Sequence, residues 1–138
     1  MTDCIYFCVD GPPVGKGRPR FGNGRAYTPK KTVEYERRIA RECGIKMEHY
    51  NLEPIGLPIK LHIHARFEIP KSWNKQKKHL AERQVIHPKK PDIDNIAKTI
   101  MDGMNGVLYE DDSQVYEVIA TKNYALEAGV TVFATWGD

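Results

Sequence analysis

Apolar and polar residues alternate most regularly between positions 57 and 70. Five apolar residues, Leu61, Ile63, Ala65, Phe67 and Ile69, alternate with five polar ones, Lys60, His62, His64, Arg66 and Glu68. Because successive side chains of a β-strand point to opposite faces, this segment is predicted to be a strand with one face in the core and a basic opposite face.

Three other segments are also predicted to be strands. "CIYFCV" at 4–9 is rich in β-favouring residues and ends at a Gly-Pro-Pro sequence, which predicts a buried strand. Segments 113–125 and 129–136 are expected to form an antiparallel pair joined near 127–129. After the segment at 4–9, "GNG" at 22–24 is a hairpin-type turn signal between two short extended pieces.

Helical periodicity indicates two amphipathic helices and one shorter helix. The first is expected to begin with Thr28 as N-cap and Pro29 at the first helical position, with a body at 31–48. The second covers 91–103, and the short helix lies around 74–84. The predicted apolar faces are Val33, Tyr35, Ile39, Ala40, Cys43 and Met47 in the first helix, and Ile93, Ile96, Ala97, Ile100, Met101 and Met104 in the second.

The order of these elements predicts one α/β (α+β) domain over 1–138, with a mixed β-sheet packed with helices. Its 138 residues suffice for a core without a metal or disulfide. The chain lacks an apolar run of about 18 residues, so no membrane span is expected. Three cysteines, Cys4, Cys8 and Cys43, without a signal-peptide pattern, are typical of a cytoplasmic protein with reduced thiols.

Charge is distributed unevenly along the chain. Residues 1–90 hold 19 Lys or Arg and 9 Asp or Glu, whereas 91–138 hold 2 and 9. A basic surface around a compact acidic site would suit a polyanion held near a metal ion, as in nucleic-acid chemistry. The alternative is that the charges form an ordinary solvated surface.

The acidic residues centre on "PDIDNIAKTIMDG" at 91–103. Asp94, Lys98 and Asp102 are four residues apart, so they form a row along one side of the predicted helix. Asp94 as N-cap and an ion pair between Asp94 and Lys98 would explain part of this row. They leave Asp92 unexplained, together with the second acidic cluster at Glu110–Asp112.

Paired carboxylates suggest a site for Mg²⁺, which prefers oxygen ligands. In an extended segment Asp92 and Asp94 would face the same way and could bind one cation. Asp111 or Asp112 would add a third carboxylate if the following strand begins beside the start of the helix. Lys98, one turn into the helix, would stabilise charge on a phosphate or orient the attacking water.

Two other metal sites are less favoured. An EF-hand loop requires Gly at its sixth position, where this chain has Ala97, so that hypothesis fails. A zinc site could use Cys4 and Cys8 with His62 and His64, but the cysteines lack C-x-x-C spacing.

Several basic residues are candidates for contact with DNA phosphates, with Phe21 and Tyr27 interleaved among them. The alternative is a soluble surface loop followed by a polar strand face. The candidate DNA-binding residues are Lys16, Arg18, Arg20, Arg25, Lys30, Lys31, His62, His64, Arg66, Lys89 and Lys90.

Two blocks of sequence resemble the RusA family of Holliday-junction resolvases, in the form found in phages and prophages. "KPDIDNIAKTIMDGMNGVLYEDDSQV" at 90–115 resembles the family's core signature, and "GKGRPRFGNGRAYTPKKTVEYE" at 15–36 resembles its basic N-terminal part. The resemblance implies a homodimeric, Mg²⁺-dependent (or Mn²⁺-dependent) endonuclease of recombination and repair that nicks opposed strands of a four-way DNA junction. No membrane and no small-molecule cofactor would be involved.

The resemblance also implies roles for particular residues. Asp92, Asp94 and Asp112 would be the metal-binding and catalytic aspartates, and Lys98 the essential lysine. Supporting roles would fall to Asn95, Asp102 and Asp111. Two alternatives remain: a non-catalytic junction-binding protein, and a less selective nuclease acting on flaps or forks.

Overall fold

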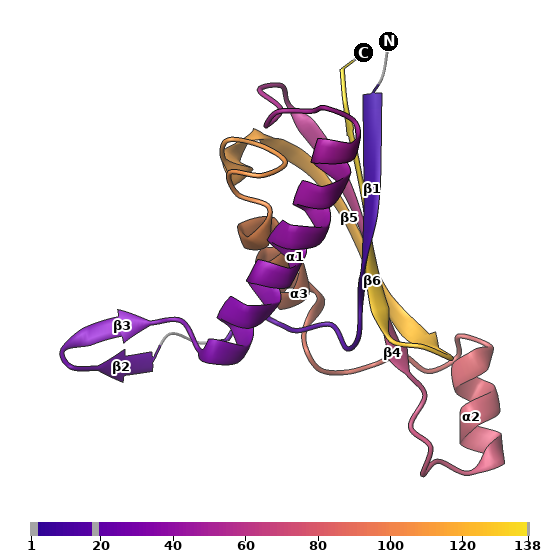
Figure 1. The fold of residues 1–138 in the computed structure, drawn as a ribbon. Helices are drawn as coiled ribbons and strands as arrows, with labels where there is room; N and C mark the ends of the chain where they lie inside the picture. The colour runs from indigo at the N-terminus through magenta and orange to yellow at the C-terminus, as the bar shows by residue number, and fades with distance from the viewer. Residues whose placement is uncertain (1–2, 18–19, 138) are drawn as a thin grey trace.

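A computed structural model describes residues 3–17 and 20–137. Four strands form the main sheet in the order β1-β6-β4-β5 (Figure 1). β1 and β4 both run antiparallel to β6, whereas β4 and β5 run parallel, so the sheet is mixed as predicted. The four strands are β1 (Asp3–Asp10), β4 (Ile59–Glu68), β5 (Val115–Ala125) and β6 (Gly129–Trp136).

The last two strands do not pair with each other, which corrects the sequence-based expectation. β4 lies between them, with Ile63 opposite Ala120 of β5 and opposite Val132 of β6. The short connection after Ala125 therefore passes the end of β4 instead of closing a hairpin. Alternation predicts which face a strand buries, but it does not predict which strands are its neighbours.

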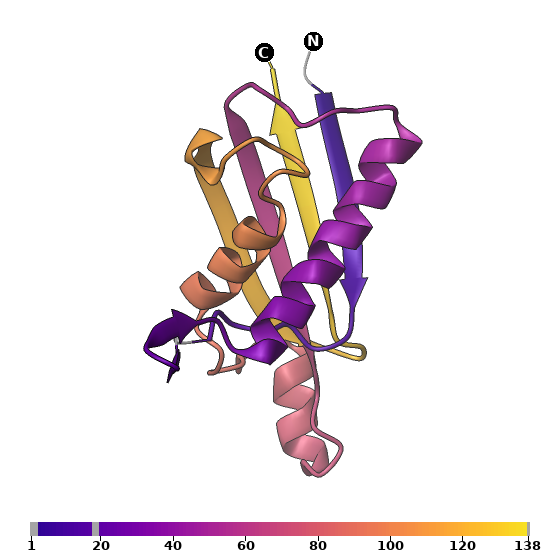
Figure 2. The same cartoon turned by 60° about the vertical axis from the view of Figure 1, so that its left-hand side comes forward.

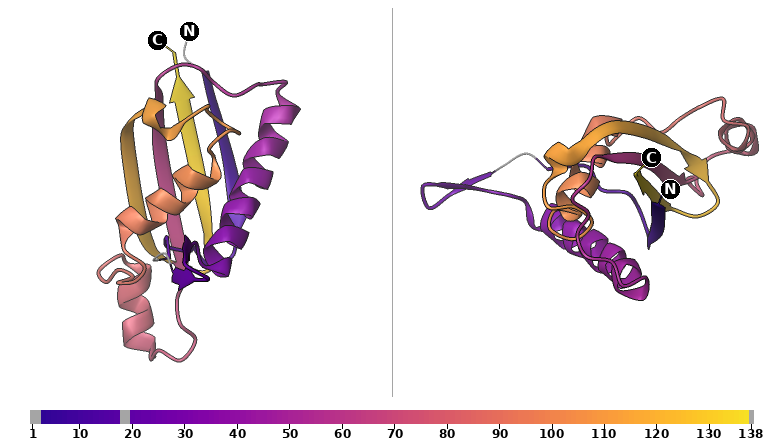
Figure 3. Two further views of the ribbon diagram at one scale, coloured as in Figure 1. Left: turned by 90° about the vertical axis from the view of Figure 1, so that its left-hand side faces the viewer. Right: turned by 90° about the horizontal axis from the view of Figure 1, so that it is seen from above.

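Two helices cover one face of this sheet, α1 (Lys30–His49) and α3 (Ile93–Gly103) (Figure 2 and Figure 3). Ile39 of α1, Ile100 of α3 and Ile63 of β4 are each 0% exposed, so the core lies between the helices and the sheet. The opposite face of the sheet is left open and carries His62, His64 and Arg66 of β4. None of the described helices is long and apolar enough to cross a membrane.

The predicted helices are present with small changes at their starts. The N-cap of α1 is Pro29 instead of Thr28, and no side chain caps it. Tyr35, Ile39, Cys43 and Met47 are buried as predicted, with Thr32 in addition, while Val33 and Ala40 are half-buried. Because proline already has helical φ and lacks an N–H to satisfy, it is well suited to this end of a helix.

Two smaller elements extend from the body of the domain. α2 (Lys75–Glu82) is capped by Asn74, whose side chain accepts a hydrogen bond from the Lys77 backbone N–H at 2.8 Å. β2 (Arg20–Gly22) and β3 (Arg25–Tyr27) form the predicted hairpin, which projects away from the sheet (Figure 1). Its turn residues Asn23 and Gly24 have φ of 51° and 74°, as a tight hairpin turn requires.

Candidate nucleic-acid and metal site

A basic pocket of about 550 Å³ lies beside the start of α3. It is formed where the segment 13–17, here called the strap, crosses the first turns of α1 and α3. Four of its lining residues were predicted to bind DNA, Lys16, Arg20, Lys31 and Lys90. Three more belong to the acidic motif at 91–103, Pro91, Asp92 and Asn95. The fold therefore brings residues far apart in the sequence to one place.

Two hydrogen bonds donated by backbone N–H groups hold the strap against the helices. The Lys16 backbone N–H donates to the Asn95 carbonyl at 3.0 Å, and the Gly17 N–H donates to the hydroxyl of buried Thr32 at 3.1 Å. Asn95 thus contributes its backbone to the position of the pocket. Gly15 allows the close approach, because a Cβ there would lie 2.6 Å from Cβ of Pro91.

Gly15→Ala is expected to displace the strap and to lower the free energy of unfolding by roughly 1–3 kcal/mol, the usual cost of overpacking. The matched control is Gly56→Ala, since a Cβ at Gly56 would have no neighbour within 4 Å. Urea unfolding of both variants measures the difference. Equal stabilities would show that the strap does not depend on the close contact with Pro91.

The Lys16 ammonium forms two ion pairs within the chain. Its Nζ lies 2.9 Å from Glu36 Oε1 of α1 and 3.0 Å from Asp102 Oδ2 of α3. Burial lowers the pKa of the Lys16 ammonium, but the hydrogen bonds and charges of Glu36 and Asp102 outweigh this effect and raise the pKa above its ordinary value. Lys16 thus ties the strap to both helices, and among the described residues that line the pocket the exposed cations are Arg20, Lys31 and Lys90.

Asp92 and Asp94 lie at the N-terminus of α3. Asp92 is the N-cap residue with extended backbone (φ −65°, ψ 147°), and Asp94 falls in the first turn, so the expectation that Asp94 is the N-cap is wrong. The Asp92 side chain makes no capping hydrogen bond, is half-exposed and lies 3.1 Å from Lys90 Nζ. The partial positive charge at a helix N-terminus favours anionic groups here.

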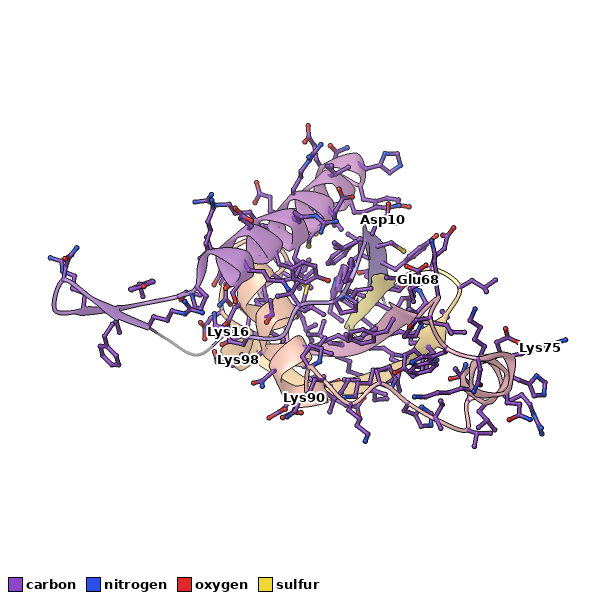
Figure 4. All side chains as sticks on the ribbon, turned by 90° about the horizontal axis from the view of Figure 1, so that it is seen from below. Asp10, Lys16, Glu68, Lys75, Lys90 and Lys98 are labelled. Atoms are coloured by element: carbon purple, nitrogen blue, oxygen red, sulfur yellow. The ribbon has the colours of Figure 1, made fainter. Side chains whose placement is uncertain are left out.

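Lys98 lies on the same side of α3 as Asp94 and Asp102. Its Nζ is 3.7 Å from Asp102 Oδ2, so among the described residues its ion pair is with Asp102 and not with Asp94 as considered from the sequence. Asp102 therefore forms ion pairs with both Lys16 and Lys98, and it is not among the residues that line the pocket. Figure 4 shows Lys16, Lys90 and Lys98 around α3, apart from Lys75 on α2.

The second acidic cluster is organised by hydrogen bonds of its own. Asp111 caps the short helix η1 (Asp112–Gln114) and accepts from the Ser113 N–H at 3.1 Å. The hydrogen bonds from Ser113 lower the pKa of Asp111. Gln114 accepts from the Asp111 N–H and donates to the carbonyls of Ile55 and Leu57, at 2.7 and 3.0 Å. Asp111 and Gln114 therefore shape this loop.

Asp112 lies away from Asp92 within one chain. Asp112 precedes Val115 at the start of β5, whereas the Pro91 carbonyl accepts from Lys122, seven residues further along that strand. Seven extended residues span roughly 23 Å. Asp112 instead lies near the C-terminal part of α3, close to Tyr109, whose hydroxyl donates a hydrogen bond to the Met101 carbonyl. Burial raises the pKa of Tyr109, and the negative charge of Asp112 raises it further.

The described residues of one chain therefore do not bring the three predicted metal ligands together. No group of three or more His, Cys, Asp or Glu side chains within 3–17 and 20–137 is placed to hold a metal ion. The strand after α3 begins beside the end of that helix, not its start, which is why the expectation for Asp112 fails within a single chain. The zinc alternative finds no support either, since β6 separates the cysteines of β1 from the histidines of β4.

The remaining predicted DNA contacts are divided between surfaces. Arg25 is exposed on the hairpin, and Lys30 is exposed at the start of α1, 3.8 Å from Glu34. Arg18 lies outside the described residues.

His62, His64 and Arg66 lie on the open face of the sheet, away from the helices and the pocket, and Arg66 donates to the Thr131 hydroxyl at 2.9 Å. They do not join the pocket within one chain. Lys89 precedes Lys90 in the loop before α3 and is also exposed.

Lys122 has a structural role that sequence analysis did not identify. Its Nζ donates to the carbonyls of Lys89 and Pro91 at 2.8 and 2.9 Å, which fixes the loop before α3 to β5. Its signal in the sequence is weak, because a single lysine in a predicted strand is ordinary. The role depends on the pairing of β5 with β4, which places Lys122 opposite the buried Ala65 and so on the helix-covered face.

Comparisons with known proteins agree with the resemblance. A model of the family described as Endodeoxyribonuclease RusA matches residues 10–134. The chain is also 35% identical over 137 residues to "Uncharacterized protein YqaN" of Bacillus subtilis (strain 168), with 94% of each chain covered. The matched residues include the strap, the start of α1, α3 and the Asp111–Gln114 segment. The chain therefore belongs to the RusA endodeoxyribonuclease family.

Proposed function

We propose that this protein is a Mg²⁺- or Mn²⁺-dependent endodeoxyribonuclease that resolves four-way DNA junctions in recombination and repair. The observation that carries the proposal is the pocket beside α3, which is lined by Arg20, Lys31 and Lys90 together with Asp92. Cations of this kind bind phosphate oxygens, and carboxylates bind the metal ions used in phosphodiester hydrolysis. Membership of an endodeoxyribonuclease family supports the same reading.

The donor set at the start of α3 suits a hard divalent cation. Mg²⁺ usually binds through one or two carboxylates, and water and substrate phosphates complete its coordination. Asp92 provides an exposed carboxylate that lines a pocket large enough for a phosphate group, and Asp94, in the first turn of α3, provides a second exposed carboxylate two residues further on. A bound cation would make a water molecule more acidic and offset the charge that develops on the phosphate.

The protein's own residues would position the DNA strand. Arg20, Lys31 and Lys90 would bind phosphates in the pocket, and the N-terminus of α3 would favour the same anionic groups. Lys98, with 61% of its side chain exposed, would approach the scissile phosphate and stabilise its developing charge. Buried Ile96 and Ile100 hold α3 rigidly on the sheet, so that these side chains start from a fixed platform.

A homodimer is part of the proposal. A four-way junction has near two-fold symmetry, and resolving it requires two symmetric cuts, which an isologous dimer can make. Because Asp112 lies far from Asp92 and Asp94 within one chain, a direct role of Asp112 at the metal would require Asp112 from a second copy of the chain. Light scattering coupled to size-exclusion chromatography measures the state of the free protein, and a monomer at working concentration would contradict this part.

The experiment that tests the function is strand cleavage of a synthetic mobile four-way junction. Each of the four strands is end-labelled in turn, and reactions contain Mg²⁺, Mn²⁺ or EDTA. Paired nicks at symmetric positions, absent with EDTA, are expected. Binding without cleavage in either metal would instead indicate a non-catalytic junction-binding protein. Equal turnover on flaps and replication forks would indicate a less selective nuclease.

A further inference from the structure

A second pocket, of about 680 Å³, lies on the other side of Lys90. It is bordered by α2, by the loop that precedes α3 and by the C-terminal ends of β4 and β5. Its lining includes Trp73, Lys77, Ile86, Lys89, Lys90 and Tyr124. Its volume falls within the roughly 300–1,000 Å³ common for sites that bind small organic groups.

The aromatic side chains of Phe67, Trp73 and Tyr124 line this pocket, and the last two are in contact. Trp73 and Tyr124 pack edge to face with ring centroids 5.1 Å apart, and Lys77 Nζ lies 4.1 Å from the Trp73 ring centroid. Both aromatic residues are half-buried, so part of each ring faces the pocket. Aromatic surface lined with lysines offers stacking to a flat ring and attraction to an anion at the same place.

The walls of this pocket are held by hydrogen bonds. Lys122 fixes the loop carrying Lys89 and Lys90 to β5, and Gln84, just after α2, donates to the Tyr124 carbonyl at 3.4 Å. The Asn74 cap fixes the start of α2 next to Trp73. The aromatic pair is therefore placed by three separate segments of the chain.

Lys90 connects this pocket to the candidate metal site. It lines both pockets, and its Nζ lies 3.1 Å from Asp92. A DNA strand with one phosphate in the first pocket would pass Lys90 and bring a neighbouring nucleotide toward Trp73 and Tyr124. The lysines along this path match the charge of the DNA backbone.

We propose that the second pocket binds one unpaired nucleobase of the strand whose phosphate lies beside Asp92; this inference rests on the proposed function. Bases at the branch point of a junction unstack most easily, and an unstacked base regains stacking on an aromatic side chain. An aromatic groove can also bind a proline-rich peptide. The lining holds three lysines, Lys77, Lys89 and Lys90, against one carboxylate, Glu68, and this balance, together with the continuity through Lys90, favours a nucleic-acid strand.

Tryptophan fluorescence allows a direct test in EDTA, where cleavage does not occur. The chain has two tryptophans, and Trp136 is only 6% exposed, so it serves as an internal reference for Trp73. The probes are a 12-nucleotide thymidine strand and an abasic strand of the same length, which share phosphates but differ in bases. Quenching of Trp73 by the thymidine strand alone is expected.

The thymidine strand is also expected to bind about 5- to 100-fold more tightly than the abasic strand, as stacking of one base predicts. Trp73→Ala should bind both strands equally. The matched control is Tyr116→Ala, which removes an exposed aromatic with Lys60 6.0 Å from its ring, near the other end of β5. Tyr124→Leu provides a second variant if Trp73→Ala unfolds, which circular dichroism detects.

Three outcomes would overturn the inference. These are equal binding of the two strands by the wild type, full discrimination retained by Trp73→Ala or Tyr124→Leu, and quenching of Trp73 by a proline-rich peptide but not by the thymidine strand. The result is separate from the nuclease test. Base discrimination without junction cleavage would refute the proposed function alone, and cleavage without base discrimination would refute the pocket alone.

Discussion

Asparagine in place of Asp92 is expected to abolish cleavage of a four-way junction and to leave junction binding intact. The substitution keeps the shape of the side chain but removes the negative charge that would bind the cation, so a loss of at least about a hundredfold in rate is expected. Binding should persist because Arg20, Lys31 and Lys90 remain in the pocket. Asp94→Asn should have the same effect on cleavage and on binding.

Cleavage rates come from the labelled junction in Mg²⁺, and affinities from gel shifts in EDTA. The control is Asp3→Asn, an exposed aspartate at the start of β1, which should cleave like the wild type. Normal cleavage by both Asp92→Asn and Asp94→Asn would refute the assignment of these aspartates as metal ligands. They would then be only charged surface residues at a helix N-terminus.

Mixed dimers show whether Asp112 acts across subunits. Asp112→Asn alone should also lose cleavage, and the mixture of Asp92→Asn with Asp112→Asn distinguishes two arrangements. If each site combines Asp92 of one chain with Asp112 of the other, a mixed dimer retains one intact site and makes single nicks. If both residues act in the same chain, both sites are damaged and the mixture is inactive.

Ile100→Ala is expected to lower the free energy of unfolding by about 2–5 kcal/mol. Ile100 is 0% exposed between α3 and the sheet, so its truncation removes packed methyl groups and leaves a cavity. Since small domains are stable by only about 5–15 kcal/mol, this is a large share. Chemical unfolding in urea measures the change.

The control for this prediction is Ile45→Ala on α1, where the side chain is 51% exposed. It should change stability by less than about 0.5 kcal/mol. Similar values for the two variants would mean that α3 is not a fixed part of the core. The carboxylates at its start would then lack the rigid support proposed for them.

Local features were predictable because their causes are local. The alternation in 57–70 and the helical period of 31–48 and 91–103 follow from the geometry of strands and helices, and the buried faces agree. The turn at Asn23-Gly24 depends on a few neighbouring residues, and so does the short helix expected around 74–84, which the structure places at Lys75–Glu82. The alternative N-cap at Asp94 was wrong by two residues, because both aspartates are acceptable there and only the path after Pro91 decides between them.

The sequence by itself determined the mixed α/β composition of the domain, the buried faces of its helices and central strand, and the acidic start of α3 that carries the proposed chemistry. Only the tertiary structure decided that β4 separates β5 from β6, that Lys16 is held by Glu36 and Asp102, and that Trp73 meets Tyr124. It also decided that Asp112 lies away from Asp92 within one chain. The physical reason is that side-chain periodicity reports which face of an element is buried, whereas contacts between distant segments depend on the path of the chain between them, and several paths are compatible with the same local pattern.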